Sequence, residues 1–354
     1  MPVLWRYALA TLPPLAMLIA GALWGGAWGA AALVWLTLLA AGLDHWLSPP
    51  APPAQGTHGP GADALSALLA LGHLALLPLA VLALADPGRS LGETVPLFFA
   101  AASFLGQVSH PNAHELIHRK SALLRGLGAA VYAAMLFGHH VSAHRLVHHR
   151  FVGTQDDPNT PRAGEGFWRF LPRAWAGSWR AGLAQETGRA ARRGQAALSL
   201  RNPYWIWVGG GALATVLAAQ LAGPAGLAWM LALAALAHMQ ILLSDYIQHY
   251  GLHRLPLPSG RIEPVGPHHS WNAPRGFSSY LMLNAPSHSD HHMHPNRPYD
   301  VLQTPADAPR LPYSLPIMAM LAVIPPVWRR NMDRRAARQM ARAADRIDPA
   351  RPAA

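Results

Sequence analysis

Long apolar stretches, separated by short polar or arginine-rich segments, dominate the hydrophobic pattern of the chain. They cover residues 4–43, 64–85, 94–110 and 202–243. Glycines near 25–29 divide the first stretch into two halves, and Gly223 with Pro224 divides the last. A helix needs about 20 apolar residues to cross a hydrocarbon core of about 30 Å. The pattern predicts an all-α, multi-pass membrane protein with about six transmembrane helices.

The first apolar stretch is expected to be a retained transmembrane hairpin over residues 1–44. The second half of this stretch follows the first half at once, and no A-x-A cleavage site of a signal peptide is apparent. Pro13 and Pro14 are expected to kink its first helix. The proline-rich segment 45–62 is expected to be a loop.

Composition and charge fit this class of protein. The chain is 51% hydrophobic and 13% charged, against about 25% charged in an average soluble domain. The formal net charge is +11, but the arginines flank apolar segments, as topology signals do, so we expect no nucleic-acid partner. Ten arginines lie in the linker 145–201, and the end of the chain is also arginine-rich. Both segments, and with six spans both termini, are therefore expected in the cytoplasm.

Histidine is the residue with candidate chemistry. There are 20 histidines, and 17 of them lie at or after His110. Nine form four clusters at the expected cytoplasmic ends of spans: His114, His118, His144, His148, His149, His249, His288, His291 and His292. The chain has no cysteine, which excludes thiolate metal sites, iron–sulfur clusters and a built-in rubredoxin centre.

One histidine pair alone is a weak signal. His45, His58 and His73 are interpreted as loop or span residues, and the pairs at 139–140 and 268–269 as neighbours of a site. Nine imidazoles near lipid would be costly without partners, and a shared metal site satisfies them together. Nitrogen ligands without thiolate fit Fe, Zn, Cu or Ni, and nine ligands suit two ions. The segment between His118 and His144 is then expected to stay at the membrane interface or to dip and return, so that the clusters can meet.

The clusters carry a specific resemblance. HELIHRK (114–120), HRLVHHR with the following DDP (144–158), DYIQHYGL (245–252) and HSDHH (288–292) resemble the histidine boxes of the integral-membrane alkane 1-monooxygenases, within the fatty-acid desaturase and hydroxylase superfamily. Residues from about 94 to 333 carry the likeness. Asp245 and Gln248 stand where the family signature has Asn and Glu, and Ala143 stands where the second box usually has Glu.

This resemblance implies a cytoplasmic di-iron site, two non-haem Fe held by the nine clustered histidines, with no catalytic residue beyond these ligands. It implies O2 activation and hydroxylation of the terminal methyl of an alkane or related hydrocarbon, with electrons from a rubredoxin and an NAD(P)H-rubredoxin reductase. It also implies a bacterial-type inner membrane. The domain division is then a hairpin over 1–44, a catalytic domain over 45–333 and a basic cytoplasmic tail over 334–354.

Further candidate residues surround the ligands. Glu115, Asp245 and Asp290 are expected to accept hydrogen bonds from the ring N–H groups that face away from the metals. An apolar substrate is expected to enter from lipid, and Trp35 is a candidate for the floor of its groove. Two alternatives stay open: a lipid desaturase or xylene-type methyl hydroxylase of the same superfamily, and a histidine-rich metal transporter. A transporter would need its ligands near the bilayer midplane.

Overall fold

The computed structural model describes residues 4–46, 58–197 and 199–347, and this part of the chain is helical, with two isolated β-bridges in place of strands. The first half contains α1 (Leu4–Trp24), α2 (Trp28–Val34), the π-helical η1 (Trp35–Leu39), α3 (Ala40–Trp46), α4 (Pro60–Ala85), α5 (Leu91–Phe104), the π-helical η2 (Leu105–Ser109), α6 (His110–Ile117) and α7 (Ala122–Ala134). Then follow α8 (His140–Ala143), the π-helical η3 (His144–His148), α9 (His149–Phe151), α10 (Phe167–Ala191) and α11 (Tyr204–His249). The last part contains η4 (Pro267–His269), α12 (Phe277–Leu281), α13 (His288–Met293), η5 (Tyr299–Val301), α14 (Leu315–Ala322) and α15 (Pro325–Ile347).

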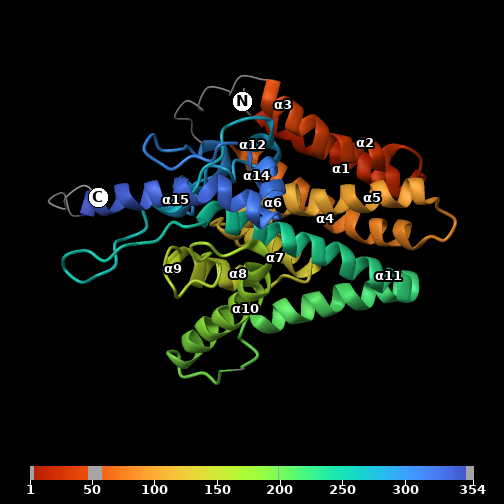
Figure 1. Cartoon of the computed structure of the whole chain (residues 1–354). Coiled ribbons are helices and arrows are strands. Elements are labelled where there is room, and N and C mark those ends of the chain that lie inside the picture. Colours follow the sequence, from red (N-terminus) through yellow and green to blue (C-terminus); the bar gives the residue numbers. More distant parts are fainter. Residues whose placement is uncertain (1–3, 47–57, 198, 348–354) are drawn as a thin grey trace.

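Among the described residues, five helices are long and apolar enough to cross a membrane: Leu4–Trp24, Trp28–Trp46, Gly61–Ala85, Leu91–Ile117 and Tyr204–His249. The last of them is a hairpin, because the backbone leaves helical geometry at Ala222 and Gly223, where Gly223 has a φ of +60°. Glycine adopts this left-handed conformation without steric cost. Figure 1 shows α11 running out along the bundle and back. The hairpin makes six membrane-length segments, which confirms the all-α, multi-pass prediction.

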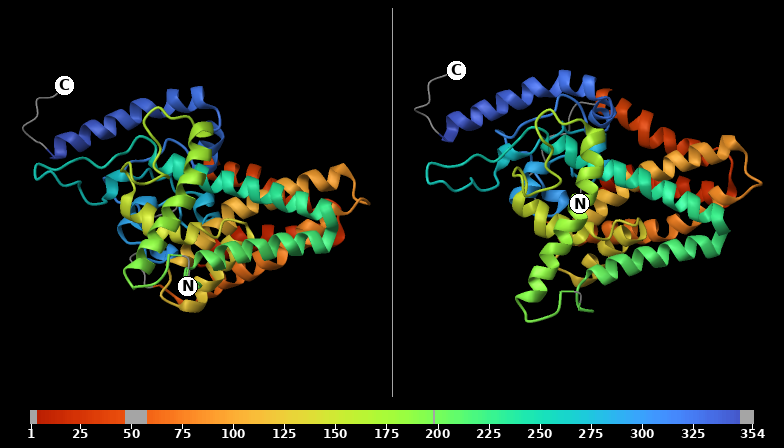
Figure 2. Two further views of the ribbon diagram at one scale, coloured as in Figure 1. Left: turned by 90° about the horizontal axis from the view of Figure 1, so that it is seen from below. Right: turned by 60° about the horizontal axis from the view of Figure 1, so that its bottom comes forward.

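The membrane-length helices pack side by side, with their tight turns at one end. α1 packs against α2 and α4, α2 against α5, and α4 against α11. The turns after α1 and α4 and the tip of α11 gather at the right of Figure 1, whereas α8, α9 and α15 lie at the left. The elements that carry the clustered histidines, among them α9 and the end of α11, lie at this opposite end. Figure 2 shows in two further views that α15 projects away from this bundle. Hereafter these are called the turn end and the histidine end.

Polar residues close the turn end. Arg89, in the turn after α4, donates to the carbonyl oxygens of Gly21 and Ala22, which end α1. Glu93 closes a capping box with Ser90 at the start of α5 and also accepts from the backbone N–H of Gly26 at 2.6 Å. These contacts satisfy backbone groups that helix ends leave without partners. They join the two turns of neighbouring hairpins.

Exposed tryptophans mark both ends of the spans. Trp24 and Trp28 lie at the turn end, and Trp5 and Trp46 lie at the opposite end of the same hairpin, all largely exposed. Tryptophan is enriched at both membrane–water interfaces because its ring is apolar and its N–H is polar. The placement fits a membrane boundary at each end.

The segment between the first two histidine clusters does not cross the bundle. α7 has 13 residues and would be about 20 Å long, which is too short for the hydrocarbon core. It packs closely against α6, and Gly128 permits the approach: a Cβ there would lie 2.8 Å from the carbonyl oxygen of Ala113. This packing keeps His118 and His144 at the same end of the molecule, as expected.

The N-terminal hairpin packs onto the later part of the chain. Arg6 donates to the hydroxyl of Tyr280 at 2.9 Å, and Asn284 donates to the hydroxyl of Tyr7 at 2.6 Å. α15 is one helix across residue 334, where the basic tail is expected to begin, and its own Trp328 is buried. Residues 47–57 of the proline-rich loop and residues 348–354 of the tail lie outside the described residues.

Candidate metal centre

The nine clustered histidines meet at the histidine end in two groups. Within each group the potential ligand atoms all lie within 4.8 Å of one another. Five form the first group: His114, His118, His144, His149 and His291. Four form the second group: His148, His249, His288 and His292. The two groups adjoin, since the ring centroids of His149 and His292 lie 4.7 Å apart.

In the five-histidine group the Nε2 atoms face one another. His114 and His144 approach to 2.8 Å, His149 and His144 to 2.9 Å, and His291 and His149 to 3.1 Å. The Nε2 of His118 is shielded and has no hydrogen-bond partner among the described residues. Metal–nitrogen bonds of about 2.0–2.1 Å place neighbouring ligands at right angles about 3 Å apart. The spacing therefore fits one cation at the centre.

The four-histidine group has the same convergence. The Nε2 of His288 lies 3.0 Å from the Nε2 of His249 and 3.0 Å from that of His292. The Nδ1 of His249 lies 3.1 Å from the carbonyl oxygen of His269, and the Nδ1 of His148 lies 2.9 Å from Oδ2 of Asp157. Acceptors at Nδ1 keep the proton on that atom and leave the Nε2 lone pair for a metal.

A π-helical turn divides the second cluster between the groups. Hydrogen bonds in a π-helix connect residues five apart. In η3 (His144–His148) the N–H of His149 therefore bonds to the carbonyl oxygen of His144, and His149 lies over His144. An α-helix would place His148 there instead. His144 and His149 thus enter the five-histidine group, while His148 turns to the other. α13 makes a similar division, because His288 and His292 are one turn apart and His291 points elsewhere.

Burial keeps most of these rings neutral, as metal binding requires. Burial lowers the pKa of His118 to about 3, with smaller effects of Arg145 and His148, and it also holds the pKa values of His144 and His149 well below the usual range. His148 differs: burial lowers its pKa, but the carboxylate of Asp157 outweighs this effect and raises it. Asp157 in turn has a lowered pKa, because His148 and several hydrogen bonds outweigh its burial.

The three carboxylates proposed for the outer ring nitrogens bind other groups. Glu115 accepts from the backbone N–H of Tyr299 at 3.1 Å and pairs with Arg119 at 2.9 Å. Asp245 accepts from Asn159 at 2.6 Å. Asp290 accepts from the backbone N–H of Gln303, and its other partners are His294 and Arg297. Within the described ranges, none of the hydrogen bonds of these carboxylates goes to one of the nine rings.

Asp157 is the carboxylate that does contact a clustered ring, and the sequence analysis did not single it out. It also accepts from the hydroxyl of Thr160 at 2.8 Å and the backbone N–H of Asn159 at 3.0 Å. The feature of the sequence that could have indicated Asp157 is the DDP run shortly after the second box, which contributed only to the family resemblance. Asn159 extends the connection to Asp245, so one chain of hydrogen bonds links His148, Asp157, Asn159 and Asp245.

Trp35, the candidate for the floor of the substrate groove, packs against α1 and α12. Its indole N–H donates to the carbonyl oxygen of Ala10 at 3.1 Å, and its ring meets Phe277 edge-on at 6.2 Å. His268 is half-buried and lies 3.5 Å from Asp307. His140, by contrast, is buried against His144 at a ring distance of 5.1 Å, and neither of its nitrogens has a partner among the described residues.

The sequence matches the family model described as fatty acid desaturase over residues 93–322. This segment contains every histidine of both groups and covers more than half of the chain. The chain belongs to the fatty acid desaturase family. The superfamily resemblance read from the histidine boxes is thereby confirmed.

Several relatives in this family are named as oxygenases. The chain is 38% identical over 224 residues to an alkane 1-monooxygenase of Pseudomonas putida, covering 62% of this chain and 55% of the relative. It is 36% identical over 247 residues to alkane 1-monooxygenase 1 of Alcanivorax borkumensis, covering 67% and 60%. It is 31% identical over 225 residues to the xylene/toluene monooxygenase hydroxylase component of Pseudomonas putida, covering 62% and 58%. The chain thus spans little more than half of the length of these relatives.

Proposed function

We propose that this chain is a membrane non-haem di-iron monooxygenase that hydroxylates the terminal methyl of an alkane or related hydrocarbon. The observation that carries the proposal is the division of nine convergent imidazoles into a group of five and a group of four. The relatives named alkane 1-monooxygenase support the reaction class. A metal transporter is disfavoured, since the histidines lie at one end of the spans, whereas a transporter carries its ligands near the bilayer midplane.

In this proposal the five-histidine group holds one Fe and the four-histidine group holds the other. Iron bound there supplies the activation of O2 and the insertion of one oxygen atom into a C–H bond. The protein's contribution is orientation and exclusion of water. Eight of the nine histidines are buried, Asp157 fixes the ring of His148 through Nδ1, and the carbonyl oxygen of His269 fixes the ring of His249.

The substrate offers no polar handle, so its recognition rests on apolar surface. A cavity of about 310 Å³ between α4, α7 and α11 is lined only by apolar residues, among them Leu77, Ala134, Leu217 and Met230. Such a lining suits a hydrocarbon that arrives from the lipid. The alternative substrate is an arene with a methyl group, because one relative is a xylene/toluene monooxygenase component.

The reaction needs two electrons per turnover, and this sequence contains no cysteine for an iron–sulfur centre of its own. We propose that an acidic rubredoxin, reduced by an NAD(P)H-rubredoxin reductase, docks at a polar hollow of about 700 Å³ beside the four-histidine group. Asp157 lines this hollow and contacts His148, so a single side chain separates the hollow from a histidine of the proposed metal site. Arg162, Arg173 and Arg254 also line it.

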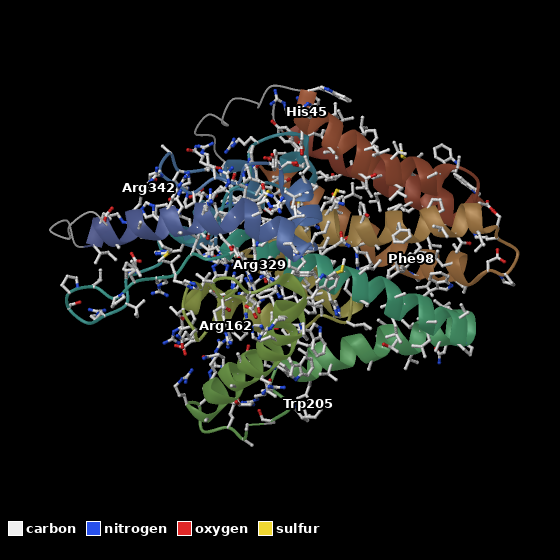
Figure 3. The ribbon with its side chains drawn as sticks, viewed as in Figure 1. His45, Phe98, Arg162, Trp205, Arg329 and Arg342 are labelled. Carbon is white, nitrogen blue, oxygen red and sulfur yellow. The ribbon has the colours of Figure 1, made fainter. Side chains whose placement is uncertain are left out.

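Charge favours this docking site. Figure 3 shows Arg162, Arg329 and Arg342 at the histidine end, whereas Phe98 lies on the spans. α15 carries further arginines and projects beyond the bundle, away from the expected lipid surface. An acidic partner would be attracted over a distance of about a Debye length. The proposal includes an inner-membrane location with this arginine-rich end in the cytoplasm, in keeping with the positive-inside rule.

The decisive experiment supplies membranes containing the protein with octane to hexadecane and with xylene, together with rubredoxin, its reductase and NAD(P)H. Formation of 1-alkanols, measured by gas chromatography, is expected. Formation of only an aryl methyl alcohol would select the xylene-type reaction, and formation of an unsaturated lipid without either alcohol would select a desaturase. A variant lacking His288 serves as the matched inactive control.

A further inference from the structure

A second cavity of about 400 Å³ lies beside the metal-bearing ends of the helices. It opens between η1, η2, the second half of α11 and α14. Leu38 and Met320 line it and are mostly exposed on the outer surface of the bundle, at 72% and 71%. Ile247, two residues before the clustered His249, lines it as well. The cavity therefore connects the neighbourhood of the metal centre with the surface expected to face lipid.

The lining of this cavity is apolar except for four side chains, and three of these already have partners. Thr37 donates to the carbonyl oxygen of Leu33 at 2.5 Å, Ser244 donates to Gln248 at 2.8 Å, and Gln240 donates to the carbonyl oxygen of Ala102 at 2.8 Å. The fourth is Gln107. Its Oε1 is shielded from solvent and has no hydrogen-bond partner in the described part of the chain. A shielded amide oxygen without a partner is destabilising.

A π-helical turn carries Gln107 into this position. Gln107 lies in η2 (Leu105–Ser109), directly before α6 and the clustered His114. The neighbouring Gly106 leaves room for Gln240, because a Cβ at residue 106 would lie 2.3 Å from its amide oxygen. π-helical turns are uncommon and occur frequently at functional sites. Both η1 and η2 contribute to the wall of this one cavity.

We propose that this cavity binds the primary alcohol product and passes it to the membrane, with its hydroxyl on the amide of Gln107. The proposal rests on the hydroxylase function proposed above. An alkane brings no group to satisfy Gln107, whereas the alcohol brings one hydroxyl that both donates and accepts. The match holds for either orientation of the amide. The cavity between α4, α7 and α11 has no such side chain. Gln107 in the second cavity is therefore the group that would favour the alcohol over the alkane there.

The test is photolabelling of the metal-loaded protein in nanodiscs, without reductant, so that no turnover occurs. The probes are 1-dodecanol with a diazirine in its chain and the matched diazirine dodecane without hydroxyl. The alcohol probe is expected to label peptides that contain Met282 and Met320, and unlabelled 1-dodecanol should compete. Gln107→Leu should weaken this competition about three- to tenfold, the range for loss of one hydrogen bond. Leu243→Met keeps the apolar wall and should leave it unchanged.

A second variant fills the cavity with a larger side chain. Ala319→Trp should abolish labelling at these peptides while iron content stays as in the wild type, which confirms a folded protein. Equal labelling by the alkane probe, labelling confined to the cavity between α4, α7 and α11, or unchanged competition in Gln107→Leu would each overturn the inference. Intact hydroxylation together with any of these results rejects the alcohol site alone. Absence of hydroxylation of every hydrocarbon rejects the proposed function and the product role with it.

Discussion

The Oδ2 of Asp157 lies 2.9 Å from the Nδ1 of His148, and both side chains are buried. Removing the carboxylate in Asp157→Ala should lower iron affinity about 10- to 100-fold, because the ring loses the partner that fixes its orientation and proton. Chelator competition on the purified protein measures this change. Asp156→Ala is the matched control, since Asp156 is the exposed neighbour. Equal iron affinity in both variants would remove Asp157 from the proposed site.

The ligand assignment makes a prediction about metal content. The purified protein should contain about two Fe per chain, because each histidine group converges on one position. His288→Ala and His148→Ala should lose iron and hydroxylase activity, measured by elemental analysis and product formation. His268→Ala should retain both, since His268 belongs to neither histidine group and its partner is Asp307. A wild-type protein that is fully active with one Zn per chain would contradict the di-iron proposal.

Buried neutral histidines predict acid sensitivity. Burial, with a smaller effect of His238, lowers the pKa of His139 to about 3, against about 6.5 in an unfolded chain. The unfolded state therefore binds the extra proton between these values, and stability present above about pH 6.5 is lost as the pH falls toward 3. His139 should contribute about 1.4 kcal/mol per pH unit in this window. Thermal unfolding of His139→Phe in detergent should fall less steeply with acid than that of the wild type, and parallel curves would show that His139 does not contribute.

Close packing of α7 on α6 predicts a difference between two glycines of one helix. A Cβ at Gly128 would lie 2.8 Å from both the carbonyl oxygen of Ala113 and the Cβ of Leu116, whereas a Cβ at Gly126 meets nothing within 4 Å. Gly128→Ala should destabilise the protein by about 1–3 kcal/mol through overpacking. Gly126→Ala should be neutral or stabilise it by up to about 1 kcal/mol, because alanine favours helix. The unfolding midpoints of the two variants measure the difference, and the reverse order is incompatible with this packing.

The docking proposal predicts a dependence on salt. The KM for an acidic rubredoxin should rise between low and physiological ionic strength, because screening weakens the attraction to the arginine-rich end of the molecule. Arg162→Glu, in the wall of the hollow, should raise this KM at low salt without changing iron content. Arg193→Glu, just beyond the end of α10, is the charge-matched control and should have a smaller effect. Equal effects of both reversals would point to general surface charge in place of the hollow.

The number of spans and the meeting of the histidines were accessible from sequence, because both follow from patterns along single helices. Apolar length marks each crossing, and the break at Gly223 marks the tip of the last hairpin. His114 and His118 share a face through their spacing in one helix. The family followed from the same boxes and is matched over residues 93–322.

Partners across the fold were less accessible, because no local pattern specifies them. Glu115 was chosen for its place beside a ligand, yet its partners are Arg119 and the backbone of Tyr299, which the chain brings back from 184 residues away. Asp157 reaches His148 only through the turn after α9. The tilt of the Trp35 ring toward Ala10 and Phe277 depends on the packing of α1 and α12, which hydropathy does not determine.

The π-helical turn at η3 determines which histidines of the second box lie on the same face. Winding residues 144–149 as an α-helix, without any change of sequence, would place His148 over His144, because residues four apart share one face of an α-helix. All three imidazoles would remain, yet His149 would no longer lie over His144. A designer who copied the histidine pattern of this box onto an ordinary helix would therefore reproduce its composition and lose the division of ligands between two metals.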